Sequence, residues 1–309
     1  MGLVLLLVIA ATLVLALATA AVVRSLRRPP RKTWARALAR GLATDPAELG
    51  LEARERTFRL PDGSTTPGWV IAGKQADGPR VVIIHGFADS RYGALTWLER
   101  VIDHAADVVV FDLPGHGEAT AALTGLGTRE PADVLAIVDE LSVEGPTRPA
   151  VLYGYSLGAS IAIGAAALDA QREHHAVAGV IADGPYARWH EPVYRTLRRR
   201  RYPAALLTTL TGLVFRVTLP GLRHIDRVRD AAATRCPLLV LHGCRDEICP
   251  LASAQRIAEA APRGRLVTFD EGCHLDLAVC EPERYQHAVA ALFAQAAAAG
   301  PGRASPPAG

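Results

Sequence analysis

Several residue patterns that mark common function classes are missing from this chain. The five cysteines form no C-x-x-C pair and no cysteine–histidine zinc spacing, so we expect no metal site. No G-x-G-x-x-G motif follows the first strand-like runs, which disfavours a cofactor-dependent oxidoreductase. The net charge of +3 is small and no basic-aromatic module is present, so we expect no nucleic-acid partner. The sequence therefore predicts a protein without metal, cofactor or nucleic acid.

The cysteines are few, odd in number and confined to the C-terminal quarter. In the cytosol we expect free thiols packed as small hydrophobic side chains. A bridge between Cys249 and Cys273 is the alternative if their loops meet, and it would place them in an oxidising compartment. The five are Cys236, Cys244, Cys249, Cys273 and Cys280.

Hydrophobic residues make up 50% of the chain, and the excess is concentrated at the N-terminus. The run Leu3–Val23 carries no charge and is long enough to cross a hydrocarbon core of about 30 Å as a helix. Basic residues follow from Arg24 to Arg36, and the positive-inside rule places this flank in the cytoplasm. A signal peptide cleaved near residues 18–20 is the alternative, but the basic n-region is missing. We expect residues 1–30 to be an uncleaved single-pass transmembrane anchor with a cytoplasmic catalytic domain.

Strand-like and helix-like segments alternate after this flank. Short β-branched runs joined by helices are typical of a mostly parallel sheet covered on both faces. We expect residues 31–298 to form this α/β domain, with 31–50 as a helical connector and 299–309 as a disordered tail rich in Gly, Pro and Ala. The expected strands are 54–60, 69–72, 81–84, 108–111, 150–153, 177–182, 237–241 and 266–269. The expected helices are 92–105, 130–143, 157–170, 252–261 and 282–298.

The most specific motif is Gly154-Tyr155-Ser156-Leu157-Gly158, which lies between a strand-like and a helix-like run. A serine on a tight strand-to-helix turn needs small neighbours, because its backbone is strained and adjacent segments crowd it. Such a turn exposes the hydroxyl beside a helix N-terminus, whose free N–H groups stabilise developing negative charge. Ser156 is therefore predicted to be a nucleophile. The alternative is an ordinary turn with glycines around a serine.

A nucleophilic serine needs a histidine to take its proton and a carboxylate to orient that histidine. His274 follows the last expected strand, and Asp246 follows the strand before it. The resulting order of serine, aspartate and histidine is the order expected for an α/β-hydrolase. Two alternatives stay open. Asp246 could cap a helix, with Asp183 as the substitute acid, and His274 could be a surface loop residue.

Together these motifs resemble an α/β-hydrolase fold enzyme, close to the serine aminopeptidase-like and monoacylglycerol-lipase-like hydrolases of bacteria. The resemblance covers about residues 54–298. Ala119 stands where the family usually has serine and Cys249 stands where it has valine, and both departures touch packing positions. Besides the Ser156 motif, the matching segments are His85-Gly86-Phe87, Phe111–Glu118, His242–Pro250 and Gly272-Cys273-His274.

The resemblance implies that Ser156, His274 and Asp246 form a catalytic triad. It also implies an oxyanion hole made by the backbone N–H groups of Phe87 and Leu157. Such donors typically contribute about 3 kcal/mol each in the transition state. Three other histidines are expected to brace loops rather than take part in the chemistry: His85, His116 and His242.

Residues 186–230 are too many for a simple connection, and we expect them to form a helical cap that selects substrates. The segment combines the arginine run Arg198–Arg201 with an apolar stretch, Ala204–Leu219. One interpretation is a lid beside anionic lipid headgroups. The other is a solvated basic turn followed by a helix packed on the core. The apolar stretch is shorter than the roughly 20 residues of a second membrane span.

The sequence thus predicts a membrane-anchored serine hydrolase that cleaves carboxylic esters, with lipid-like acyl esters as the expected substrates. A serine aminopeptidase-like peptidase is the closest alternative, although no acidic pocket for a substrate amine can be placed. A non-catalytic hydrolase relative that binds a ligand or partner at the membrane is an alternative of another class. Dehalogenases and epoxide hydrolases are disfavoured because they need a carboxylate at the position of Ser156.

Overall fold

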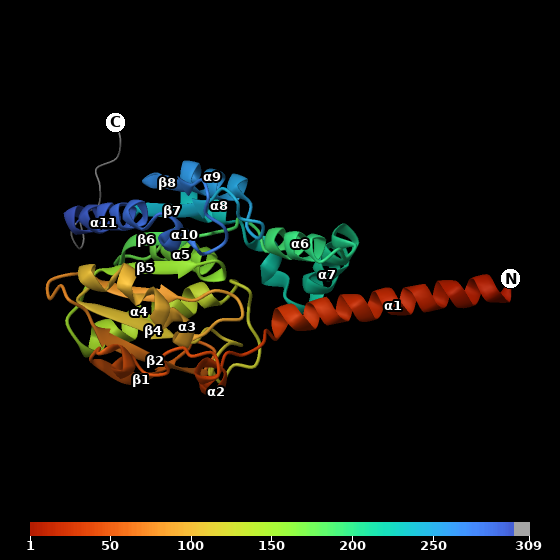
Figure 1. The fold of residues 1–309 in the computed structure, drawn as a ribbon, viewed down its shortest axis with the longest axis horizontal. Helices are drawn as coiled ribbons and strands as arrows, with labels where there is room; N and C mark the ends of the chain where they lie inside the picture. The colour runs from red at the N-terminus through yellow and green to blue at the C-terminus, as the bar shows by residue number, and fades with distance from the viewer. Residues whose placement is uncertain (300–309) are drawn as a thin grey trace.

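An eight-stranded sheet lies at the centre of the structure, a computed structural model that describes residues 1–299 (Figure 1). Its strand order is β1-β2-β4-β3-β5-β6-β7-β8. β1 (Ala53–Arg59) and β2 (Thr65–Ala72) are antiparallel to their neighbours, and all pairs from β4 to β8 are parallel. The expected mostly parallel sheet is therefore confirmed. Its parallel strands are β3 (Arg80–Ile84), β4 (Asp107–Phe111), β5 (Ala150–Tyr155), β6 (Val177–Asp183), β7 (Leu238–Gly243) and β8 (Gly264–Phe269).

Helices cover both faces of the sheet, because successive strand residues point to opposite sides. Val82 and Ile84 belong to the core on one face, and Val81 and Ile83 belong to the core on the other. The first face is covered by α4 (Glu130–Glu144), α5 (Leu157–Asp169), α8 (Arg227–Ala232) and α9 (Leu251–Ala260). The second is covered by α2 (Trp34–Leu38), α3 (Arg91–Ala94), α10 (Leu277–Cys280) and α11 (Pro282–Ala299).

The single helix expected over 92–105 is wrong. The structure has α3 followed by two 3₁₀ segments, η2 (Leu95–Arg100) and η3 (Ile102–His104). Four buried side chains in this region follow one another at intervals of three residues, and a 3₁₀-helix with three residues per turn places such residues on one face. Packing against the sheet therefore selects the tighter helix. These side chains are Tyr92, Leu95, Leu98 and Val101.

The expected helical connector at 31–50 contains only α2 and the 3₁₀ segment η1 (Pro46–Leu49). Gly41 and Gly50 adopt positive φ angles of 67° and 71°, so the chain turns out of the helical conformation at both positions. At the other end of the chain, α11 reaches Ala299, the first residue of the expected disordered tail. Residues 300–309 lie outside the described part of the chain.

The segment expected to form a cap is helical and is inserted between β6 and β7. It contains α6 (His190–Arg199), α7 (Ala204–Thr218) and the 3₁₀ segment η4 (Pro220–His224), and α8 follows. The apolar N-terminal run forms one helix, α1 (Gly2–Arg27), which lies beside α7 and then projects away from the rest of the molecule (Figure 1). By length and composition α1 fits a membrane span, and it fits a signal sequence equally well.

Candidate active site

Ser156 lies on the turn between β5 and α5, as the sequence motif predicts. Its backbone adopts φ 55° and ψ −114°, a conformation that costs a non-glycine residue about 1–3 kcal/mol. The N–H of Ser156 donates a hydrogen bond to the carbonyl oxygen of Asp183 over 2.8 Å, which ties the turn to the end of β6. The surrounding sheet therefore holds the strained turn in place.

Two glycines allow this turn to pack. A Cβ atom on Gly158 would lie 1.9 Å from the carbonyl oxygen of Ile84, and one on Gly154 would lie 2.1 Å from the carbonyl oxygen of Gly158. Both distances are far below any real Cβ contact, and both involve backbone atoms that cannot move aside independently. The glycines are thus required by the close approach of α5 to β3 and β5.

The structure brings together the three side chains that the sequence nominated as a triad. The Nε2 atom of His274 lies 3.1 Å from the Oγ atom of Ser156, and its Nδ1 atom lies 2.7 Å from Oδ2 of Asp246. Asp246 and His274 stand on the loops that follow β7 and β8. Parallel strands end at the same edge of a sheet, which explains how residues remote in sequence meet.

Asp246 is held as a charged acceptor. Its Oδ1 atom accepts hydrogen bonds from the N–H groups of Ile248 and Cys249, each over 2.7 Å. Burial pushes the pKa of Asp246 upward, but the hydrogen bond to His274 and the backbone amides outweigh it, and the net pKa is lowered. The carbonyl oxygen of Asp246 also accepts a hydrogen bond from the Nη1 atom of Arg195 in α6, over 3.0 Å. The cap is thus bonded to the loop that carries the acid.

The alternative acid, Asp183, is hydrogen-bonded to another residue. Its Oδ2 atom accepts a hydrogen bond from the hydroxyl of Tyr285 over 2.7 Å. Burial raises the pKa of Asp183 to about 7, so it is far less suited than Asp246 to carry a negative charge. Asp246, and not Asp183, faces the Nδ1 atom of His274.

Two backbone N–H groups lie where an oxyanion hole is expected. Leu157 is the first residue of α5, so its N–H has no partner within the helix. Across residues 1–299, the N–H groups of Phe87 and Leu157 donate no hydrogen bond to another protein group. A Cβ atom on Gly86 would lie 3.4 Å from Cβ of Ser156, so the loop that carries Phe87 is adjacent to the nucleophile candidate.

Residues 81–295 match the family model described as "Alpha/beta hydrolase family". This chain belongs to the α/β-hydrolase family. The human protein ABHD12B is 24% identical over 227 residues, which cover 69% of this chain and 60% of that protein. The chain thus matches somewhat less than two thirds of that relative's length.

One relative of this chain is an esterase by name. The pimeloyl-[acyl-carrier protein] methyl ester esterase of Xanthomonas campestris is 30% identical over 234 residues, covering 64% of this chain and 88% of that enzyme. Among solved structures, the esterase Pf2001 of Pyrococcus furiosus superimposes with a TM-score of 0.69 at 21% identity. That match covers 87% of this chain and 97% of the other, and at such low identity it shows a shared fold.

Three histidines near the candidate site lie within hydrogen-bond distance of backbone groups. His85 accepts a hydrogen bond at Nε2 from the N–H of Leu113 over 2.9 Å, and its Nδ1 atom lies 2.8 Å from the carbonyl oxygen of Gly86. The Nδ1 atoms of His116 and His242 lie 3.0 Å and 2.9 Å from backbone carbonyl oxygens. Burial lowers the pKa of all three, that of His116 to about 3. They are neutral near pH 7 and fix the loops around Ser156.

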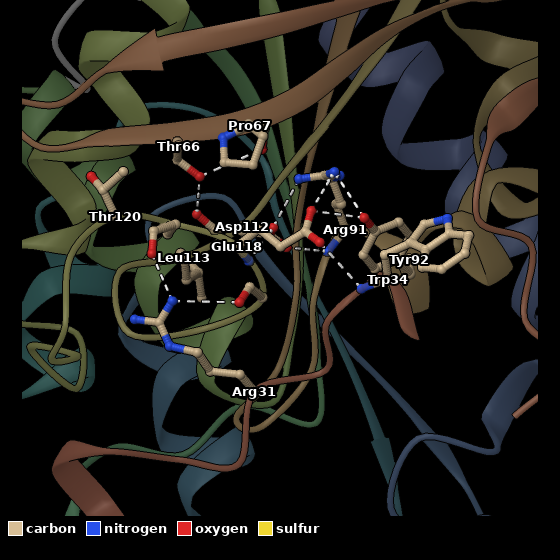
Figure 2. Close-up of polar contacts among 12 residues, drawn as sticks. Arg31, Trp34, Thr66, Pro67, Arg91, Tyr92, Asp112, Leu113, Glu118 and Thr120 are labelled. Carbon is tan, nitrogen blue, oxygen red and sulfur yellow. Dashed lines mark hydrogen bonds and ion pairs between the residues drawn. The ribbon is translucent and has the colours of Figure 1, made fainter. Parts of the chain in front are cut away.

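A buried charge network that the sequence did not reveal supports the loop after β4 (Figure 2). Arg91 donates through its backbone N–H and Nη1 to Asp112, over 2.7 Å and 3.1 Å, and through Nη2 to Glu118 over 2.7 Å. The guanidinium group also lies 4.6 Å from the ring centre of Trp69. Asp112 and Glu118 lie in the recognised motif 111–118, but no sequence signal pairs them with Arg91.

Two basic side chains that follow α1 bind other groups of the protein. Arg31 donates hydrogen bonds to the carbonyl oxygens of Ala119 and Ala121, over 2.6 Å and 2.5 Å (Figure 2). Lys32 forms an ion pair with Asp89, on the loop that follows Phe87. The basic flank therefore anchors loops beside the candidate site, a role that its charge pattern did not predict.

Asp246, Cys249 and His274 place potential metal-ligand atoms within 4.8 Å of one another. However, the Asp246 and His274 atoms are hydrogen-bonded to each other, and burial raises the pKa of the Cys249 thiol well above its usual value. A protonated thiol is a poor zinc ligand, so this donor set fits a triad better than a metal. All five cysteines are free, and the conceivable bridge between Cys249 and Cys273 is not formed.

Proposed function

We propose that this hydrolase cleaves carboxylic esters through an acyl-enzyme, with Ser156, His274 and Asp246 as its catalytic triad. The observation that carries the proposal is the continuous hydrogen-bond chain from the Ser156 hydroxyl through His274 to the Asp246 carboxylate. Serine hydrolases use this arrangement of hydroxyl, imidazole and carboxylate. Membership of a family whose named relatives include esterases supports the ester bond as the target.

Each group has one task in the proposed reaction. The Oγ atom of Ser156 attacks the ester carbonyl carbon while His274 takes its proton at Nε2. The N–H groups of Phe87 and Leu157 hold the oxyanion, and Asp246 stabilises the imidazolium that forms. His274 then gives the proton to the departing alcohol. A water molecule then attacks the acyl-enzyme while His274 takes its proton. His274 returns this proton to Ser156 as the carboxylic acid leaves.

Lipid-like acyl esters are the proposed substrate class. The cap contributes an apolar cluster around Phe215, against which Trp189 and the end of α1 pack. α1 attaches the enzyme to a membrane, with the hydrolase domain on the cytoplasmic side as the basic flank favours. Medium-chain p-nitrophenyl esters should accordingly be hydrolysed with a higher kcat/KM than the acetyl ester, and the reverse preference would remove this substrate class.

Fluorophosphonate labelling tests the triad directly. The wild-type enzyme should be labelled and Ser156→Ala should not. Ser142→Ala serves as the matched control, because Ser142 lies in α4 and its hydroxyl donates a hydrogen bond to the carbonyl oxygen of Val138 in the same helix. Folded wild-type protein that resists labelling would favour the non-catalytic binding protein. Faster turnover of aminoacyl amides than of esters would favour the peptidase.

A further inference from the structure

The two halves of α1 have different surroundings. Between Leu15 and Leu26, α1 packs against the cap through contacts at both ends of α7. Every residue of Gly2–Val14 is exposed, and this free half projects beyond the cap (Figure 1). At about 1.5 Å per residue the free half is about 20 Å long, shorter than a hydrocarbon core of about 30 Å. If α1 enters a bilayer while docked, the cap must therefore meet the membrane surface.

The turn between α6 and α7 lies at the level where the free half of α1 begins. Leu197 precedes the turn and Ala204 follows it, and both share one hydrophobic cluster with Leu15 and Ala18 of α1. The run Arg198–Arg201 lies between these two cap residues. Four cations are thereby placed near the point where α1 leaves the cap.

These arginines are free to bind an external partner. All four are exposed, and within residues 1–299 Arg198, Arg200 and Arg201 form no ion pair with an acidic side chain. Arg199 lies 3.5 Å from Glu247, and both side chains are largely exposed, so that pair is weak. Tyr202 follows the run and is 56% exposed. Cations and a tyrosine beside an exposed apolar helix are the pattern found at membrane–water interfaces.

We propose that the run Arg198–Arg201, which covers the end of α6 and the turn after it, binds the anionic headgroups of a bilayer into which the free half of α1, Gly2–Val14, inserts. This inference rests on the membrane attachment proposed above and identifies the surface that touches the lipid. Guanidinium groups suit this role because they bind phosphate oxygens through paired hydrogen bonds. In the basic flank, by contrast, Arg31 and Lys32 are already bonded to protein groups.

The proposed contact is close to the catalytic machinery. Arg195, one turn of α6 before the arginine run, donates its hydrogen bond to the carbonyl oxygen of Asp246. Leu206, just beyond the run, begins a row of apolar side chains along α7, in which Leu206, Leu213 and Val217 are exposed and Leu210 is half-buried. The row continues through Leu210, Leu213 and Val217 at helical spacing. A cap resting on lipid would therefore hold the active-site side of the domain next to membrane-dissolved substrates.

Partitioning of the full-length protein between water and vesicles tests the proposal. The protein is diluted from detergent onto phosphatidylcholine vesicles, or onto vesicles with about one third phosphatidylglycerol, and bound protein is separated by flotation. The test variant is R198Q/R200Q/R201Q, which spares Arg199 beside Glu247. The charge-matched control is R54Q/R263Q/R265Q, whose exposed arginines lie near the sheet edges, away from α1 (Figure 1). Thermal unfolding checks that each variant is folded.

For each protein, the partition coefficient on anionic vesicles is divided by that on phosphatidylcholine vesicles. This ratio isolates the contribution of charge, because α1 inserts into both kinds of vesicle. We expect wild type and the control to prefer anionic vesicles, and the turn variant to lose this preference by on the order of 100-fold. Equal losses in the two variants, or no loss in the turn variant, would overturn the proposal. Fluorophosphonate labelling in the same samples reports the triad separately, so a failure of the esterase function is distinguishable from a failure of the lipid contact.

Discussion

The exposure of apolar side chains differs between two regions of the molecule. One is the body, which is the sheet with the helices that cover it, and the other is the cap together with α1. In the body, β3 and β5 are buried along their whole length, with helices on both sides. In the cap, α7 buries Leu207 and Phe215 on one face but leaves Leu213 50% and Val217 84% exposed on another. The body buries its apolar side chains within itself, whereas the cap leaves apolar surface exposed that a further layer can cover. The proposed lipid contact supplies that layer.

Charged groups show the same contrast. Arg80 and Arg91 in the body are almost fully buried and are paired with Asp107 and Asp112. The arginines of the α6–α7 turn are exposed instead. Buried pairs fix neighbouring loops in one arrangement, while exposed arginines remain available to phosphate groups. Catalysis and stability should therefore depend mainly on the body, and lipid contact on the cap.

Replacing the proposed base should give the largest effect. His274→Ala removes the group that accepts the Ser156 proton, so kcat for ester hydrolysis should fall by on the order of 10⁴–10⁶-fold. The preference of the full-length protein for anionic vesicles should not change, because the substitution leaves the exposed arginines Arg198–Arg201 in place. Steady-state kinetics and flotation measure the two outcomes. Hydrolysis within tenfold of wild type would contradict the proposed mechanism.

Two glycine substitutions should have opposite effects on stability in the two regions. In Gly158→Ala the new Cβ atom would meet the carbonyl oxygen of Ile84 at 1.9 Å, which should lower the free energy of unfolding by roughly 1–3 kcal/mol or more. In Gly212→Ala, within α7, the Cβ atom would lie 3.5 Å from Trp189, an ordinary contact. The better helix propensity of alanine should then stabilise the protein by up to about 1 kcal/mol. Thermal unfolding of both variants should show melting shifts of opposite sign.

Asp133, in α4 of the body, should make stability depend on pH. Burial, followed by the nearby Glu130 and Asp62, raises the pKa of Asp133 to about 7. The native state therefore binds more protons than the unfolded state between about pH 4 and 7, and the free energy of unfolding falls as pH rises through this window. Asp133→Asn should raise it by about 1–3 kcal/mol at about pH 8 and have little effect at about pH 4. Urea unfolding at both pH values provides the measurement. An equal increase in the free energy of unfolding at both pH values would show that the raised pKa of Asp133 is not the cause.

The smallest expected effect concerns the link between cap and body. Arg195→Met removes the hydrogen bond to the carbonyl oxygen of Asp246, and kcat should fall roughly 5-fold because the acid loop is less well fixed. Arg199→Met breaks only an exposed ion pair and should change kcat less than about 2-fold. Both are measured in detergent solution without vesicles, with Arg195→Lys expected to recover part of the loss. Equal effects of Arg195→Met and Arg199→Met would show that the cap does not position the acid.

Much of the fold could be predicted because local pattern and tertiary structure agree there. Apolar β-branched runs predicted the positions of β3 to β8 to within a few residues. The central strands β3 and β5 are buried on both faces, as expected for parallel strands, whereas the edge strand β8 begins with exposed residues. The region 92–105 was mistaken for one helix because a spacing of three residues is compatible with both helix types. The choice between them was made by contacts with the sheet, and these involve residues distant in the chain.

The site shows the same division. Ser156, Asp246 and His274 could be nominated because each stands in a short motif at the end of an expected strand. The clamp of Arg91 on Asp112 and Glu118 could not, because its members come from separate loops. The bonds from Arg31 to the loop at 119–121 and from Arg195 to Asp246 also join segments with no shared local pattern.

The sequence by itself determined the order of strands and helices, the strained serine turn and the apolar N-terminal helix, because these depend on local backbone preferences and hydrophobic periodicity. Only the tertiary structure decided that Asp246 rather than Asp183 faces His274. It also decided that half of α1 is docked on the cap and that the run Arg198–Arg201 lies near the point where the free half begins. These contacts depend on which distant segments meet when the chain folds, and short-range sequence patterns do not specify those meetings.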